Sequence, residues 1–195
     1  MAFANHHDAR SIADTLDGYS LLASNRVAQG WSPLIVTMMF NRLHGRPEPI
    51  LHQMLDEASR VYQTFVTRVV RRPLSLRSVS ELPIMIAAPD FSVGKSDKPV
   101  SQISLNDGLH LHAILLVPPR SRLAIPVEEH FRTHQALYVN DRSRLVTLDV
   151  RPIRDGIELA AEYILKSVRR RRFSPDDVLL LPRTLAEMRD STFSR

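Results

Sequence analysis

The segment GLHLHAILLVPP, residues 108–119, predicts the centre of the fold. Its aliphatic run is interrupted only by His110 and His112 near the start, and two prolines end it. Side chains of a strand alternate between the two faces of its sheet, so the two histidines share one face. Because both faces are otherwise apolar, residues 109–117 are expected to form a strand in the middle of a sheet that is covered on both sides.

The two histidines have two interpretations. On one face of a strand, the rings of His110 and His112 project side by side, about 6–7 Å apart along the backbone, so that both can reach one metal ion. Alternatively, they are partly buried packing residues whose ring nitrogens hydrogen-bond to nearby backbone. The pair by itself leaves both interpretations open.

Apolar spacing predicts the other elements of the fold. Residues 50–70 are the clearest case, because apolar side chains recur there every three or four positions, as on one face of a helix. A further helix is expected to begin at Ser174, a good capping residue that precedes two acidic residues. The remaining predicted elements are strands over residues 34–40, 81–91 and 145–150, and helices over residues 9–29 (one helix or two), 127–137 and 157–170.

This order of elements is typical of an α+β fold of the ferredoxin-like (RRM-like) type, with helices packed on an antiparallel sheet. The sheet and its helices are expected to occupy one domain over residues 31–172. Residues 1–30 are predicted to form an N-terminal helical extension, and residues 173–195 a C-terminal helical tail.

Composition limits the classes of function. The chain of 195 residues contains no cysteine, which excludes disulfides, zinc–thiolate sites and thiol nucleophiles. Its six glycines form no phosphate-binding loop motif. A net charge of +5 favours an anionic partner, with nucleic acid first. No apolar run approaches the roughly 18 residues of a membrane helix, and the N-terminus lacks a signal pattern, so a cytoplasmic location and no membrane partner are expected.

The predicted helix over residues 157–170 carries a second group of reactive side chains. Tyr163 and Lys166 are three positions apart and therefore lie on one side of the helix, away from its apolar stripe. They are either available for chemistry or simply a boundary tyrosine beside a solvated lysine. The arginines that follow, Arg169, Arg170, Arg171 and Arg172, are either a solvated helix end or a phosphate-binding patch.

Three motifs in this order resemble those of the HUH endonucleases, the family of rolling-circle replication initiators, relaxases and single-strand transposases. The first is an apolar strand with a threonine, here residues 34–41 with Thr37. The second is the pair of His110 and His112 on a strand, and the third is Tyr163 followed by Lys166 on a helix. The resemblance covers roughly residues 31–172, and it is to those members of the family that have one catalytic tyrosine.

The resemblance implies an enzyme that nicks and rejoins single-stranded DNA. Tyr163 would be the nucleophile, Lys166 would stabilise the phosphate, and His110 and His112 would hold Mg²⁺ or Mn²⁺. The family usually has a third metal ligand on a neighbouring strand. If residues 81–91 and 109–117 pair as a hairpin, Asp90 is the best candidate, and Glu81 is the second choice.

The partners implied by the resemblance are single-stranded DNA or a DNA hairpin, which Thr37, Asn41 and the arginines at 169–172 would contact. The chain contains no helicase segment, so a separate helicase would have to open a duplex. The alternatives are a non-catalytic module of ferredoxin-like fold that binds single-stranded nucleic acid, and a structural domain in which the histidines only pack.

The other histidines give a weaker indication of function than His110 and His112. His130 and His134 have the helical i, i+4 spacing of a metal-binding pair, but no metalloprotease glutamate accompanies them. His6 and His7 are assigned no role. A geometric criterion separates the enzyme from its alternatives: the Tyr163 hydroxyl has to lie close enough to His110 and His112 for all three to contact one phosphate.

Overall fold

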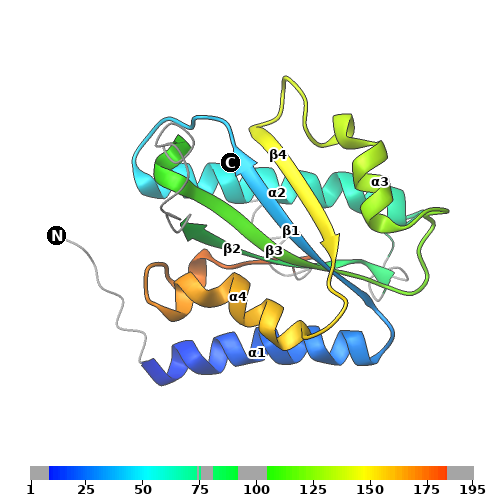
Figure 1. The fold of residues 1–195 in the computed structure, drawn as a ribbon, viewed down its shortest axis with the longest axis horizontal. Coiled ribbons are helices and arrows are strands. Elements are labelled where there is room, and N and C mark those ends of the chain that lie inside the picture. The colour runs from blue at the N-terminus through cyan, green and yellow to red at the C-terminus, as the bar shows by residue number, and fades with distance from the viewer. Residues whose placement is uncertain (1–8, 74, 76–80, 92–104, 184–195) are drawn as a thin grey trace.

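One antiparallel sheet organises the molecule. The computed structural model describes residues 9–73, 75, 81–91 and 105–183. Within these residues, five strands are arranged in the order β4-β1-β3-β2-β5, and all neighbours are antiparallel (Figure 1). The strands are β1 (Ser32–Phe40), β2 (Ile84–Phe91), β3 (Leu109–Val117), β4 (Leu145–Pro152) and β5 (Leu179–Leu181). The predicted α+β class with a ferredoxin-like sheet is confirmed, and β3 is its central strand.

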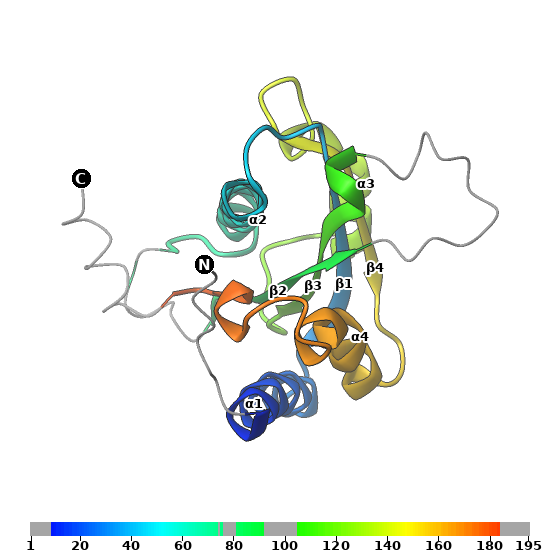
Figure 2. The ribbon, with the colours of Figure 1, turned by 90° about the vertical axis from the view of Figure 1, so that its left-hand side faces the viewer.

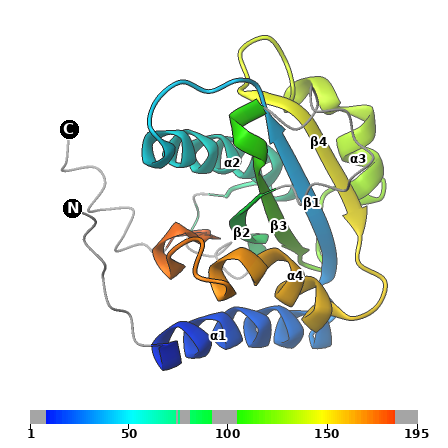
Figure 3. The ribbon, with the colours of Figure 1, turned by 60° about the vertical axis from the view of Figure 1, so that its left-hand side comes forward.

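Four α-helices cover the two faces of the sheet in the part of the chain that the structure describes. They are α1 (Ala9–Ala28), α2 (Pro47–Val69), α3 (Val127–Thr133) and α4 (Ile157–Arg169). In Figure 2, α2 lies on one side of β2, and α1 and α4 lie on the other. The helices α1 and α4 run side by side, and α4 packs on β2 and β3 (Figure 3). The sheet is therefore the middle layer between two layers of helices.

Each face of β3 belongs to a different hydrophobic core, which explains why the sequence of this strand is apolar apart from its histidines. Leu111 and Leu115 pack in the core on the α2 side, and Phe65 of α2 is part of that core. Ile114 belongs to the core on the side of α1 and α4, together with Ile164 of α4. Every residue of β3 is buried, as expected for a central strand with cover on both faces.

Several boundaries differ from those predicted. The N-terminal segment forms one continuous helix, and α2 begins at Pro47 because proline fits the first turn of a helix, where its missing N–H is not needed. The strand β2 begins at Ile84, so Glu81 lies before it. The predicted helix over residues 127–137 is α3 followed by a separate 3₁₀ turn, Gln135–Leu137.

The prediction of a helix that begins at Ser174 is wrong. Ser174 does cap a helical turn, and the cap has the reciprocal hydrogen bonds of a capping box, but the turn is a 3₁₀ helix of three residues, Pro175–Asp177. The apolar run that follows becomes β5, which pairs with the free edge of β2. A capping signal marks where a helix starts and says nothing about its length, and here strand pairing buries Leu179 and Leu181. The rest of the predicted tail, residues 184–195, lies outside the described residues.

Candidate metal centre and its tyrosine

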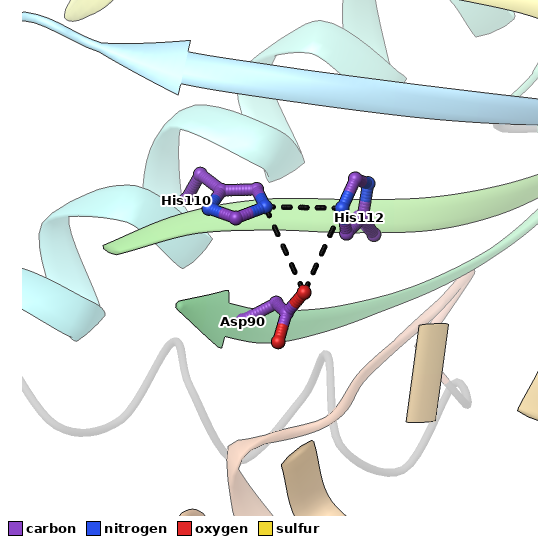
Figure 4. A group of neighbouring side chains, drawn as sticks. All are labelled: Asp90, His110 and His112. Carbon is purple, nitrogen blue, oxygen red and sulfur yellow. Dashed lines mark hydrogen bonds and ion pairs between the residues drawn. The ribbon is translucent and has the colours of Figure 1, made fainter. Parts of the chain in front are cut away.

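Pairing of β2 with β3 brings a carboxylate beside the two histidines. The register places Asp90 opposite His110, so both side chains lie on the face of the sheet that α1 and α4 cover. His112 follows on the same face of β3, as strand alternation predicts. Figure 4 shows the three side chains pointing toward one another from the two strands. The predicted hairpin and its register are therefore confirmed, whereas the second choice, Glu81, is exposed before the opposite end of β2.

The distances within this group match those of a metal site. The Nε2 atoms of His110 and His112 are 3.0 Å apart, and each lies 3.8 Å from Oδ2 of Asp90. A point equidistant from three atoms with these separations lies about 2.1 Å from each, which is a normal metal–ligand bond length. The three residues are buried, with at most 5% of any one of them exposed. Asp90, His110 and His112 could therefore hold one metal ion, and they are the only such group of three among the described residues.

Neighbouring groups orient both imidazole rings. Nδ1 of His110 lies 3.0 Å from the carbonyl oxygen of Gly108. Because a carbonyl can only accept, this nitrogen carries the proton, and a neutral ring then has its lone pair on Nε2. Nδ1 of His112 lies 3.1 Å from Oγ1 of Thr37, which is the cross-strand partner of His112 on β1. Such contacts on the far side of a ring are typical of metal-binding histidines.

Two residues of α4 hold the carboxylate of Asp90. Lys166 places Nζ 2.6 Å from Oδ2, and the hydroxyl of Ser167 donates to Oδ1 over 2.6 Å. Burial alone would raise the pKa of the Asp90 carboxyl. The hydrogen bonds from Lys166 and Ser167, together with the charge of Lys166, outweigh burial and lower the pKa below its ordinary value. Asp90 is therefore ionised at neutral pH, as a metal ligand has to be.

The environment of His112 favours its neutral form. Burial lowers the pKa of His112 to about 4, and the nearby charge of His110 acts in the same direction, whereas Asp90 opposes the shift. At pH 7 the ring is consequently uncharged, and a ring nitrogen can offer its lone pair to a cation. Two such nitrogens 3.0 Å apart, as in His110 and His112, can share a proton or bind one cation.

Tyr163 lies over the histidine pair, on the same face of the sheet. Its hydroxyl oxygen is 3.3 Å from Nε2 of His112, and the two ring centroids are 5.0 Å apart. Nζ of Lys166 lies 3.9 Å from the centroid of the tyrosine ring, in cation–π geometry. Tyr163 is 45% exposed, so a substrate can reach it from outside. The Tyr163 hydroxyl and His112 are therefore close enough to contact one phosphate, whereas catalysis by this group stays a prediction.

Ser167 is the functional neighbour that reasoning from the sequence missed. It is only 1% exposed, and its hydroxyl contacts Asp90, 77 positions earlier in the chain. The available signal was its position: residue 167 is three positions after Ile164 and falls on the apolar stripe of the helix. A lone polar residue on a core-facing stripe requires a buried partner.

The predicted nucleic-acid contacts divide into two groups. Thr37 contacts His112, whereas Asn41 is exposed and its side chain donates to the carbonyl of Leu145 over 3.4 Å. The four arginines after Lys166 are exposed at the end of α4, and Arg169 lies 3.6 Å from Asp17 of α1. Their role in binding nucleic acid stays a prediction.

The other histidine pair is a packing feature of α3. Nε2 of His130 lies 2.9 Å from the hydroxyl of Tyr138, and its ring stacks on that of His134. No third ligand joins this pair among the described residues. His6 and His7 lie outside the described residues.

Comparisons of the chain with protein-family models, with curated proteins and with solved structures yield no match. The resemblance to HUH endonucleases rests on the three sequence motifs. No helix among the described residues combines the length and apolarity needed to cross a membrane.

Proposed function

We propose that this protein is a metal-dependent endonuclease and strand transferase that nicks and rejoins single-stranded DNA, as in rolling-circle replication initiation or the transfer of a mobile element. The observation that carries the proposal is the 3.3 Å distance between the Tyr163 hydroxyl and Nε2 of His112, within a buried group of two imidazoles and one carboxylate. A nucleophile beside a candidate metal centre is an arrangement suited to phosphodiester cleavage, because the metal ion offsets the charge that develops on the phosphate.

The reaction proceeds through a covalent link to Tyr163. Its oxygen forms a bond to phosphorus, and the bond between phosphorus and the 3′ oxygen of the preceding nucleotide breaks. The phenolic proton leaves to water, which reaches the half-exposed side chain, and the 3′ oxygen takes up a proton. The products are a 5′-phosphotyrosine and a free 3′-hydroxyl, and attack by a 3′-hydroxyl reverses the step and joins the strands.

The metal that we propose is Mg²⁺ or Mn²⁺, held by His110, His112 and Asp90. Two nitrogen ligands favour Mn²⁺ over Mg²⁺. When bound, the ion polarises a phosphate oxygen and offsets charge in the transition state. Gly108 and Thr37 orient the two imidazoles, and Lys166 stabilises negative charge on the phosphate and on the tyrosine oxygen.

The strand would reach this site along a basic surface at the end of α4. Arg169, Arg170, Arg171 and Arg172 are exposed shortly after Tyr163 in the chain, and guanidinium groups bind phosphate oxygens well, although Arg169 would have to exchange its ion pair with Asp17. A separate helicase would have to open duplex DNA first. The site therefore suits an exposed strand or the single-stranded part of a hairpin.

Incubation of the purified protein with Mn²⁺ and a pool of single-stranded oligonucleotides tests the proposal. We expect a covalent adduct that survives denaturing electrophoresis in the wild type and is lost in Tyr163→Phe. Tyr19→Phe is the matched control, because Tyr19 is also partly exposed but lies on α1. An adduct that persists in Tyr163→Phe would exclude this nucleophile.

The same experiment identifies the alternative function. Binding that weakens steeply with salt, without an adduct under Mg²⁺, Mn²⁺ or Zn²⁺, would indicate a non-catalytic module for single-stranded nucleic acid.

A further inference from the structure

Lys166 occupies the carboxylate oxygen that a metal ion would need. Its ammonium nitrogen is 2.6 Å from Oδ2 of Asp90, and the same oxygen faces the Nε2 atoms of both histidines. An ion equidistant from the three ligand atoms would lie about 2.1 Å from Oδ2. The lysine and the ion therefore compete for one buried oxygen.

Two cations cannot share this oxygen without a large electrostatic penalty. The side chain of Asp90 is only 2% exposed, so water screens the repulsion weakly. His110 and His112 bring no negative charge, and Asp90 is the only acidic member of the group. Binding of the ion consequently requires Lys166 to withdraw or to find another anion.

We propose that Lys166 couples metal binding to phosphate binding. In the free protein its ammonium neutralises Asp90 and keeps metal affinity low. A DNA phosphate beside Tyr163 accepts the ammonium, which frees Oδ2 for the ion, so that metal and strand bind with positive cooperativity. By thermodynamic linkage, each raises the affinity for the other by the same factor. The identity of the anion as a DNA phosphate rests on the proposed function.

The surroundings of Lys166 allow such an exchange. Its side chain is 22% exposed and has three donors on a flexible stem, and Asp90 is its only oxygen partner among the described residues. The Tyr163 ring, 3.9 Å from the ammonium, keeps this group beside the attacking hydroxyl. Ser167 donates to the other carboxylate oxygen, Oδ1, and so continues to hold Asp90 when the lysine leaves.

Titration of the protein with Mn²⁺ alone, followed by electron paramagnetic resonance of the free ion, tests the competition. At mildly alkaline pH we expect Lys166→Met to bind Mn²⁺ between about 5-fold and about 150-fold more tightly than the wild type, the usual range of such couplings. The melting temperature should also rise more on addition of Mn²⁺ in Lys166→Met, because the ion then supplies the only counter-charge to Asp90.

Two variants control for charge and shape. Lys166→Arg keeps the positive charge and should bind Mn²⁺ as weakly as the wild type. Arg132→Met removes one positive charge from the exposed face of α3 and should leave the affinity for Mn²⁺ unchanged. Binding by Lys166→Met that is no tighter than that of the wild type would overturn the proposal.

A second titration measures the coupling itself. In Tyr163→Phe, which is expected to form no adduct, saturation with a random-sequence single-stranded oligonucleotide pool should raise the affinity for Mn²⁺. In the Tyr163→Phe/Lys166→Met double variant this factor should shrink, and an equal factor in both would contradict the coupling. Wild-type protein that forms an adduct while Lys166→Met binds Mn²⁺ unchanged would refute the coupling alone. Coupled binding without an adduct would refute the proposed reaction alone.

Discussion

At the scale of single residues, the site depends on contacts behind the ligands as much as on the ligands. The carbonyl of Gly108 sets which nitrogen of His110 carries the proton, and Thr37 occupies the equivalent position behind His112. Neither contact involves substrate, yet both aim the Nε2 atoms at one point. The motif resemblance assigned Thr37 to nucleic-acid binding. The structure shows instead that its hydroxyl contacts the ring of His112.

Burial of His112 predicts a loss of stability in acid. In the unfolded chain its pKa is near 6.5, whereas in the folded protein it is lowered to about 4. Between these values the unfolded state binds more protons, so the free energy of unfolding falls as the pH drops, by about 3 kcal/mol in total. Urea unfolding of the metal-free protein across this range should show the slope, and His112→Gln should largely remove it.

The control for this experiment is His52→Gln, which alters an exposed histidine on α2. It should retain the wild-type slope. Equal slopes in the wild type and His112→Gln would show that another group causes the acid sensitivity.

At the scale of elements, one side of α4 packs into the hydrophobic core, and another side presents Tyr163 to the candidate site. Ile164 and Val168 pack into the core between the sheet and α1, and Tyr163 is exposed at the edge of the candidate site. Lys166, on the side of Tyr163, and Ser167, on the apolar stripe, both hold Asp90. Any shift of the helix along β2 would therefore move Tyr163, the proposed nucleophile, together with the two side chains that hold Asp90.

Ser167→Ala tests the support given by the helix. The substitution removes a hydrogen bond to a buried carboxylate, so we expect a decrease of about 1–3 kcal/mol in the free energy of unfolding, together with weaker Mn²⁺ binding. Chemical denaturation and Mn²⁺ titration measure the two effects. Ser24→Ala is the matched control, since it removes an exposed hydrogen bond between α1 and Glu158 of α4 and should change the free energy of unfolding by about 0.5 kcal/mol at most, with Mn²⁺ affinity unaltered.

At the scale of the whole molecule, the site exists only where two layers meet. The candidate ligands come from the hairpin of β2 and β3, the threonine beside His112 from β1, and the proposed nucleophile from α4. The arginines that follow α4 extend this region with positive charge, whereas α2 lies on the opposite face of the sheet. A bound strand is therefore expected to follow the face that carries α4.

Salt dependence of DNA binding tests this placement. Replacing Arg170 and Arg172 with glutamine should make the slope of log affinity against log salt shallower, by about 0.7 for each phosphate that the protein no longer neutralises. Arg171 is left in place because its φ of 56° lies in the left-handed region, where a substitution adds backbone effects. Fluorescence anisotropy with single-stranded DNA measures the slopes. Unchanged slopes would place the strand elsewhere.

Local sequence was sufficient for the elements whose pattern is regular. The alternation in residues 109–117 determined a central strand with both histidines on one face. Asp90 was selected by combining the third ligand that the resemblance implies with an assumed hairpin, whose register the structure confirms. The apolar spacing of α2 and α4 likewise determined which sides of these helices are buried. These inferences succeeded because periodicities of two and 3.6 residues are properties of the chain itself.

Only the tertiary structure decided the features that depend on contacts between distant segments. The run after Ser174 became β5 because the edge of β2 was open to pair with it, and no local pattern records a free edge. Ser167 and Lys166 meet Asp90 across more than seventy positions of sequence, so their shared hold on one carboxylate depends on how α4 is placed on the sheet. The sequence alone determined the residues with suitable chemistry. The packing of α4 on the sheet decided that Tyr163 and Lys166 lie beside the candidate metal ligands, because side chains that far apart in the chain are brought together only when the apolar stripe of the helix is buried.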